Sequence, residues 1–117
     1  MKTILIVDDD AKYRSMMRLK LEASGFHVME ADDGEKALDT VHQHAASIDL
    51  ILLDLVMSGM DGLTFYYHFK KSLNSDKPVI VLTNLSTTAY PSDIKDIYIK
   101  TDITLDALVK KIQDRIS

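Results

Sequence analysis

The stretch ILIVDDD, residues 4–10, places four branched apolar residues directly before three carboxylates. A short run of this kind is typical of a strand that is buried on both faces. It is too short for a membrane span, which needs about 20 apolar residues. It is also too short for a signal peptide. The stretch therefore predicts a buried strand whose carboxyl end carries acidic side chains.

Short apolar runs alternate with segments of helical periodicity along most of the chain. Further strands are predicted at residues 26–31, 48–53, 79–83 and 97–99. Helices are predicted at residues 11–24, from a cap at Asp32 or Asp33 to about residue 45, from a cap at Asp61 to about residue 73, and from a cap at Thr104 to about residue 116. Alternation of this sort implies βαβ units, a parallel sheet and helices on both of its faces.

Residues 84–95 interrupt the alternation. They contain Ser86, Thr87 and Thr88, whose side chains compete for local backbone hydrogen bonds. They also contain Pro91, which lacks an N–H and disfavours a helix through the residue before it. We therefore expect at most a short helix or turn here, so that the fourth helix of the fold is shortened or missing.

Composition limits the classes of function. A length of 117 residues predicts one domain, residues 1–117. A net charge of -4 argues against non-specific binding of nucleic acid, which needs a basic face. The absence of cysteine excludes disulfides and Cys-based zinc or redox sites. Without a visible targeting segment or membrane span, we expect a cytoplasmic protein that does not bind membranes.

Polar side chains recur where the predicted strands end. Asp8 and Asp9 directly follow the first strand, and Asp54 follows the third. Thr83 closes the fourth strand, and Lys100 follows the fifth. The carboxyl ends of parallel strands share one edge of the sheet, where doubly wound folds bind their ligands. These side chains are therefore expected to converge if the first and third strands are neighbours.

Such a group of side chains has a defined chemistry. Clustered carboxylates repel one another unless a cation joins them, and hard oxygen ligands favour Mg²⁺. A carboxylate beside Mg²⁺ can act as a nucleophile toward phosphorus, and an ammonium with a hydroxyl can hold phosphoryl oxygens. Each residue also has an ordinary explanation: Asp9 or Asp10 can cap the first helix, and Lys100 can be a solvated side chain. The coincidence at four strand ends favours the chemical interpretation.

The segments ILIVDDD, LLDLVMSGMDGL, VIVLT and YIK, in that order, resemble the receiver domain of bacterial two-component response regulators. The resemblance covers nearly the whole chain. It implies a flavodoxin-like, doubly wound α/β fold with a five-stranded parallel sheet in the order 2-1-3-4-5. It also implies that Asp54 is the phosphoacceptor, Thr83 the switch hydroxyl and Lys100 the cation that binds the phosphate.

The resemblance further implies a Mg²⁺ site formed by Asp9, Asp54 and the backbone carbonyl of Val56, with Asp8 acting mainly through a metal-bound water. The phosphoryl group would come from a histidine kinase, a phosphotransfer protein or a small phosphodonor. The domain would label itself and later lose the label by its own activity. A stand-alone receiver of this kind would signal to a downstream protein target, as a monomer or weak dimer, without direct contact with nucleic acid.

Several positions depart from the family pattern. Thr101 follows the lysine where the family usually has a proline in a cis peptide. Because a cis non-proline bond costs about 3 kcal/mol, we expect the Lys100–Thr101 bond to be trans. Asn84 stands where a small residue is usual. Val56 and Leu85 are apolar at positions that flank the approach of an attacking water, which predicts a long-lived phosphoryl group.

Two other classes of protein remain as alternatives. An aspartate-nucleophile phosphohydrolase of the haloacid-dehalogenase type would share the Asp8-x-Asp10 pattern, but Lys12 does not fit the residue that should follow. A receiver-like interaction module that takes no phosphate is the second alternative. Mg²⁺-dependent labelling by a small phosphodonor separates the three.

Overall fold

The structure is a computed structural model that describes residues 1–57, 61–72, 76–84 and 93–116. Strands and helices alternate along this part of the chain, as the periodicity predicts. The strands are β1 (Thr3–Val7), β2 (His27–Ala31), β3 (Leu50–Leu53), β4 (Val79–Thr83) and β5 (Asp96–Ile99). The helices are α1 (Ala11–Ala23), α2 (Gly34–His44), α3 (Gly62–Ser72) and α4 (Leu105–Ile116), with a short 3-10 helix, η1 (Lys100–Asp102), after β5.

The five strands form one parallel sheet in the order β2-β1-β3-β4-β5. Val7 of β1 is in register with Ala31 of β2 on one side and with Leu53 of β3 on the other. This is the doubly wound, flavodoxin-like α/β fold that the sequence predicts. The register places the carboxyl ends of β1 and β3 side by side.

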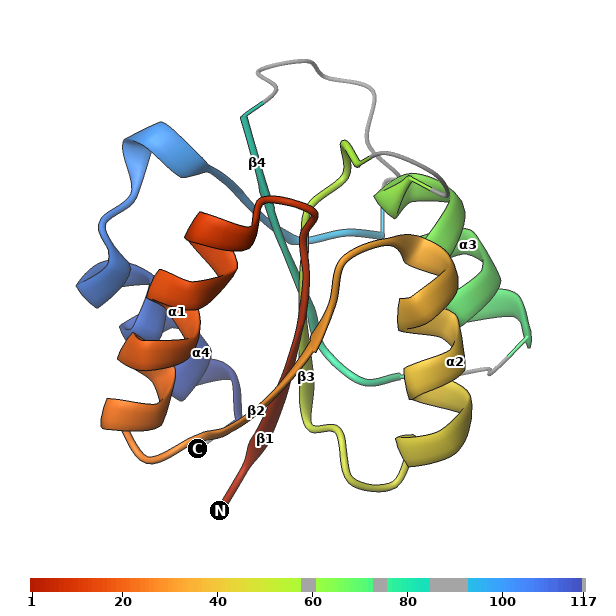
Figure 1. Cartoon of the computed structure of the whole chain (residues 1–117), viewed down its shortest axis with the longest axis horizontal. Coiled ribbons are helices and arrows are strands. Elements are labelled where there is room, and N and C mark those ends of the chain that lie inside the picture. Colours follow the sequence, from red (N-terminus) through yellow and green to blue (C-terminus); the bar gives the residue numbers. More distant parts are fainter. Residues whose placement is uncertain (58–60, 73–75, 85–92, 117) are drawn as a thin grey trace.

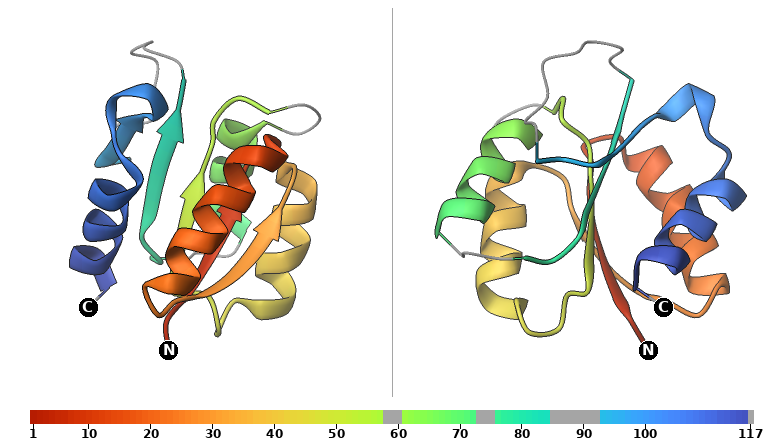
Figure 2. Two further views of the ribbon diagram at one scale, coloured as in Figure 1. Left: turned by 60° about the vertical axis from the view of Figure 1, so that its left-hand side comes forward. Right: turned by 180° about the vertical axis from the view of Figure 1, so that it is seen from behind.

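Helices cover both faces of the sheet. Figures 1 and 2 show α1 and α4 together on one face and α2 and α3 together on the other. Side chains of successive strand residues point to opposite faces, so Leu5 joins the core under α2 and α3 while Ile4 and Ile6 join the core under α1 and α4. All five residues of β1 are buried, which confirms the strand predicted to be buried on both faces.

Local side-chain caps fix where the helices begin. Asp61 accepts the N–H of Thr64 at 2.8 Å, which confirms the predicted cap of α3, and Asp33 accepts the N–H of Lys36 at 2.8 Å, which decides between Asp32 and Asp33 at α2. Asp10 caps α1 in the same way, and this leaves the neighbouring Asp9 outside the capping role.

The predicted irregular segment lies mostly outside the described residues, since 85–92 are not among them. Among the described residues between β4 and β5, at 84 and 93–95, no helix occurs. Within the described residues, no helix is both long enough and apolar enough to cross a membrane.

Candidate functional site

The site is built from the ends of β1 and β3. Val7 and Leu53 are register partners, so Asp8 and Asp54 leave neighbouring strands at the same level. The Asp54 N–H donates to the Val7 carbonyl at 2.9 Å, and the Asp8 N–H donates to the Ala31 carbonyl at 3.1 Å. These backbone hydrogen bonds extend the sheet by one residue and fix both carboxylates at its carboxyl edge.

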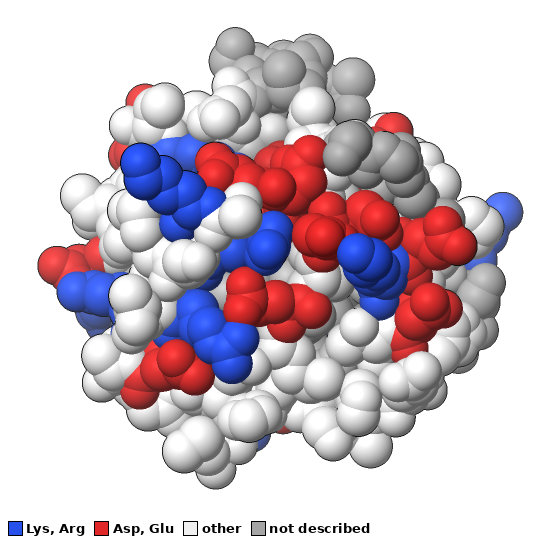
Figure 3. Space-filling model, in the orientation of Figure 1, with Lys and Arg blue, Asp and Glu red and all other residues white. Residues whose placement is uncertain are grey.

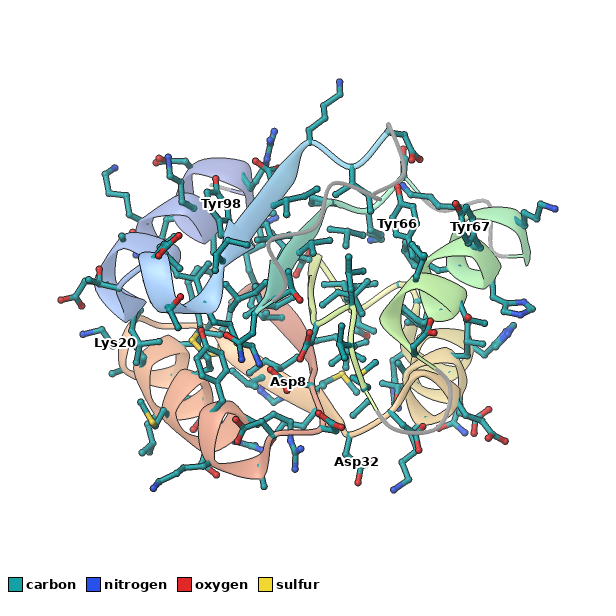
Figure 4. All side chains as sticks on the ribbon, turned by 90° about the horizontal axis from the view of Figure 1, so that it is seen from above. Asp8, Lys20, Asp32, Tyr66, Tyr67 and Tyr98 are labelled. Atoms are coloured by element: carbon teal, nitrogen blue, oxygen red, sulfur yellow. The ribbon has the colours of Figure 1, made fainter. Side chains whose placement is uncertain are left out.

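Three carboxylates meet at this edge. Asp8 and Asp54 are buried, Asp9 is exposed, and one oxygen from each lies within 4.8 Å of the others. Figure 4, which views this edge from above, places Asp8 between the two helix layers. Figure 3 shows acidic side chains in a broad band across one face, with Lys and Arg among them. The predicted convergence of Asp8, Asp9 and Asp54 is therefore present.

Lys100 brings a cation into the acidic cluster. It begins η1 directly after β5, and its Nζ lies 2.6 Å from Asp8 Oδ2 and 3.2 Å from Asp54 Oδ2. Burial alone would lower the pKa of Lys100, but the hydrogen bond and charge of Asp8, together with Asp54, raise it above its usual value. No cis peptide occurs among the described residues, so the Lys100–Thr101 bond is trans as expected.

The Asp54 carboxylate accepts a hydrogen bond from the backbone of the loop that follows it. Its Oδ1 accepts the N–H of Val56 at 3.1 Å, while the Val56 side chain is half exposed. Burial is the largest influence on the Asp54 carboxyl and raises its pKa, against the opposing effects of the Val56 N–H and Lys100. Gly62, at the start of α3, packs directly against the Asp54 backbone: a Cβ at this position would lie 1.9 Å from the Asp54 carbonyl oxygen.

Thr83 ends β4 and is fully buried. It is the register partner of Ile99, the residue before Lys100. The strand order places β4 directly between β3 and β5. The hydroxyl residue therefore stands at the same edge as Asp54 and Lys100, where the sequence places it.

Two further residues at the site were not singled out from the sequence. Arg14 Nη1 donates to the Asp8 carbonyl oxygen at 2.7 Å, and Arg14 Nε lies 3.1 Å from Glu30 Oε1 of β2. The ring of Tyr13 lies under the Lys100 ammonium, with 4.4 Å from Nζ to the ring centroid. Both belong to the first turns of a helix that follows an acidic strand end, and this is the sequence signal that could have identified them.

The arrangement of these side chains defines a class of binding site. Three carboxylates and one ammonium lie at the carboxyl edge of a doubly wound sheet, at the position where such folds bind ligands. Asp8 and Asp54 are both close to the ammonium and to the other acids. This is the donor set for a hard cation and for a phosphoryl group.

Comparison with known proteins gives the family. Residues 4–115 match the response regulator receiver domain. The chain therefore belongs to this family and is a phosphoacceptor signalling domain of the response-regulator type. Membership of this family over nearly the whole chain excludes the haloacid-dehalogenase alternative.

Individual relatives agree with the family match. The transcriptional regulatory protein CpxR of Escherichia coli is 41% identical over 83 residues, which cover 71% of this chain and 34% of that protein. The phosphate regulon regulatory protein PhoB of Escherichia coli is 39% identical over 83 residues, covering 70% and 35%. The matched part of the chain thus spans about a third of the length of these curated relatives.

Solved receiver structures share the whole fold. The Francisella response regulator 1452 receiver domain superposes with a TM-score of 0.87 at 26% identity, covering 99% of this chain and 97% of that one. The response regulator TrrA of Thermotoga maritima, solved in complex with Mg²⁺ and BeF, gives a TM-score of 0.80 at 31% identity, covering 97% and 98%.

Proposed function

We propose that Asp54 takes a phosphoryl group from the phosphohistidine of a histidine kinase or phosphotransfer protein. The observation that carries the proposal is the position of Asp54 at the β3 end, 3.2 Å from the Lys100 ammonium and within the acidic cluster. A carboxylate oxygen of Asp54 attacks phosphorus, the phosphorus–nitrogen bond breaks, and the donor imidazole leaves. The product is an aspartyl phosphate.

Lys100 and Thr83 hold the phosphoryl oxygens in this proposal. The raised pKa of Lys100 keeps its ammonium charged at neutral pH, and an ammonium forms strong, charge-assisted hydrogen bonds with phosphoryl oxygens. Thr83 supplies a hydroxyl from the neighbouring strand end. The position of Thr83 at the end of β4, and the distance of 3.2 Å from Lys100 Nζ to Asp54 Oδ2, support these two roles.

The donor set fits Mg²⁺. The clustered ligand atoms are carboxylate oxygens, which are hard ligands, and their mutual repulsion calls for a cation. Asp9, Asp54 and the backbone carbonyl of Val56 would hold the ion, and Asp8 would act indirectly through water. When bound, Mg²⁺ offsets the charge of the carboxylates and of the incoming phosphoryl oxygens. The related TrrA protein, solved with Mg²⁺ and BeF, supports this assignment.

The wider role follows from this chemistry. Residues 1–117 form one receiver domain that labels itself from small phosphodonors and loses the label by hydrolysis. It works in the cytoplasm, where histidine kinases use ATP, and it passes its signal to a downstream protein target. We propose a monomer or weak dimer with no direct nucleic-acid contact and no membrane attachment.

Mass spectrometry after incubation with acetyl phosphate and Mg²⁺ tests the proposal. The native protein is expected to gain one phosphoryl group, and Asp54→Asn none. Asp39→Asn, an exposed carboxylate on α2, serves as the matched control and should label normally. Stoichiometric labelling of Asp54→Asn would contradict the assignment of the acceptor. Failure of the native protein to label would favour the interaction-module alternative.

Phosphotransfer from purified histidine kinases of the source organism tests the donor. One kinase is expected to transfer its label to the native protein much faster than the others do. Equal, slow transfer from all of them would leave small phosphodonors as the source of the phosphoryl group and contradict the kinase assignment.

A further inference from the structure

The ring of Tyr13, on α1, contacts the Lys100 ammonium. It lies in the first turn of α1, three residues after the Asp10 cap, whose carboxylate accepts the Tyr13 N–H. Lys100 Nζ lies 4.4 Å from the centroid of the Tyr13 ring. This distance is within the range of a cation–π interaction, in which the negative face of an aromatic ring attracts a cation.

The contact is shielded from water. The Lys100 side chain is only 7% exposed, and desolvated cation–π contacts are stronger than exposed ones. In contrast, Thr101 and Asp102, which follow in η1, are exposed and do not restrict the Lys100 side chain by packing around it. The Tyr13 ring thus adds an aromatic contact to the ion pairs that Lys100 makes with Asp8 and Asp54.

The Tyr13 ring differs from the two carboxylates because it leaves the N–H groups of the Lys100 ammonium available for other hydrogen bonds. Asp8 and Asp54 bind the ammonium through hydrogen bonds, which occupy its N–H groups and their own oxygens. An aromatic face attracts the ammonium without accepting such directed hydrogen bonds. The ring can therefore hold Lys100 in place while its N–H groups turn toward other oxygens.

We propose that Tyr13 is a positioning residue for phosphoacceptance: its ring confines the Lys100 ammonium at the carboxyl edge so that the ammonium faces a phosphoryl group on Asp54. The inference rests on the proposed function of Asp54 and Lys100, and it adds a residue from α1 to that site.

The ring and not the hydroxyl makes this contact. Within the described part of the chain, the buried hydroxyl oxygen of Tyr13 has no hydrogen-bond partner. Tyr13→Phe keeps the ring and removes only this hydroxyl, whereas Tyr13→Leu removes the ring. The pair of variants therefore separates the proposed role from general packing at the same position.

A first measurement is independent of phosphorylation. In the NMR spectrum of the metal-free protein, the ring current of Tyr13 should shift the ε-methylene protons of Lys100 upfield. The shift should persist in Tyr13→Phe and disappear in Tyr13→Leu. An unshifted Lys100 signal in the native protein would overturn the contact, whether or not Asp54 is the phosphoacceptor.

A second measurement is the rate of labelling by acetyl phosphate with Mg²⁺. From the strength of cation–π contacts, Tyr13→Leu should be slower by roughly threefold to thirtyfold. Tyr13→Phe should restore most of the rate. Tyr67→Leu, the same change at a half-exposed position on α3, is the matched control and should label at the native rate.

A double-mutant cycle decides whether Tyr13 acts through Lys100. In a Lys100→Met background, Tyr13→Leu should cause no further loss of rate. An equal further loss would overturn the positioning role, as would a native rate in Tyr13→Leu. If the native protein takes no label at all, the proposed function fails, while the NMR shift still tests the Tyr13–Lys100 contact.

Discussion

Opposing influences act on the pKa of the Asp54 carboxyl group. Burial raises its pKa, and the Val56 N–H and the Lys100 ammonium lower it, with a net upward direction. A raised carboxyl pKa means that the folded protein binds a proton more readily than the unfolded chain does. Stability is therefore lost as the pH rises from the unfolded-state pKa through the folded-state pKa. The ionised Asp54 carboxylate, which is the proposed phosphoacceptor, therefore lowers the stability of the folded protein at neutral pH.

Asp54→Asn is expected to stabilise the metal-free protein at pH 7, because it removes this buried charge. The melting temperature of Asp54→Asn at pH 7 should therefore lie above that of the native protein. The gain should shrink as the pH falls toward about 4, near the ordinary carboxyl pKa. Thermal melts across this pH range check the prediction, with Asp39→Asn as the control. A gain that is equal at both ends of the range would contradict the electrostatic cause.

Val56 is the apolar residue beside the acceptor. Its side chain is 50% exposed, and its own N–H is bound to Asp54 Oδ1. A valine side chain cannot hydrogen-bond a water and orient it for attack on an aspartyl phosphate. The phosphoryl group should therefore be long-lived. The second apolar residue expected to flank this approach, Leu85, lies outside the described residues.

Val56→Asn is expected to accelerate loss of the phosphoryl group by roughly tenfold to a hundredfold, since positioning of a reactant is worth a few kcal/mol at most in such a case. A decay time course of purified phosphoprotein checks this. Leu19→Asn, an exposed apolar position on α1, is the control and should decay like the native protein. Unchanged decay in Val56→Asn would show that this side chain does not gate the water.

At the scale of elements, the start of α3 is fixed by its close approach to the end of β3. The Gly62 N–H donates to the Leu55 carbonyl at 3.1 Å, and there is no space for a Cβ beside the Asp54 carbonyl. A side chain at this position would force α3 or the Asp54 loop to move. The helix and the acceptor residue are thus coupled through one glycine.

Gly62→Ala should lower the free energy of unfolding by about 2 to 3 kcal/mol, the usual scale of steric overpacking. It should also slow labelling by acetyl phosphate, because the Asp54 loop shifts. Gly25→Ala is the informative control: its φ of 93° strains an alanine, but no heavy atom lies within 4 Å of a Cβ there. That change should cost about 1 kcal/mol and leave the labelling rate unchanged. Equal stability of the two variants would contradict the steric argument.

The first turns of α1 connect three elements. Arg14 joins the Asp8 carbonyl at the end of β1 to Glu30 in β2, and Tyr13 contacts Lys100 after β5. Through these contacts, α1 helps to orient the acidic residues at the end of β1 and the Lys100 ammonium beside them. Its role in the site is positional, and it depends on contacts with residues far away in the sequence.

At the scale of the whole molecule, the crowding of carboxylates at one edge makes stability depend on cations. Mg²⁺ that binds only the folded state raises stability by mass action. Saturating Mg²⁺ is therefore expected to raise the melting temperature of the native protein. Asp9→Ala should remove most of the gain, and Asp39→Ala on α2 should retain it. If Mg²⁺ leaves the native melting temperature unchanged, the proposed metal site is wrong.

Several features of this protein follow from the sequence alone. Apolar runs and helical periods predict the strands and helices, because both periodicities are local properties of the backbone. The caps at Asp61 and Thr104 are local too, since a side chain there bonds an N–H three residues later. Asp54 and Lys100 could be predicted as site residues because parallel strands end at one edge.

The tertiary structure alone decided the rest. The sequence left open which acid caps α1 and whether Asp32 or Asp33 caps α2, and the structure assigns these roles to Asp10 and Asp33. The contact of Tyr13 with Lys100 and the close packing of Gly62 on Asp54 have no signature in composition or periodicity. They depend on how α1 and α3 dock on the sheet, which is set by the packing of residues distant in the chain. Local patterns fix the elements and the edge where the site lies, and long-range packing fixes which neighbours aim its groups.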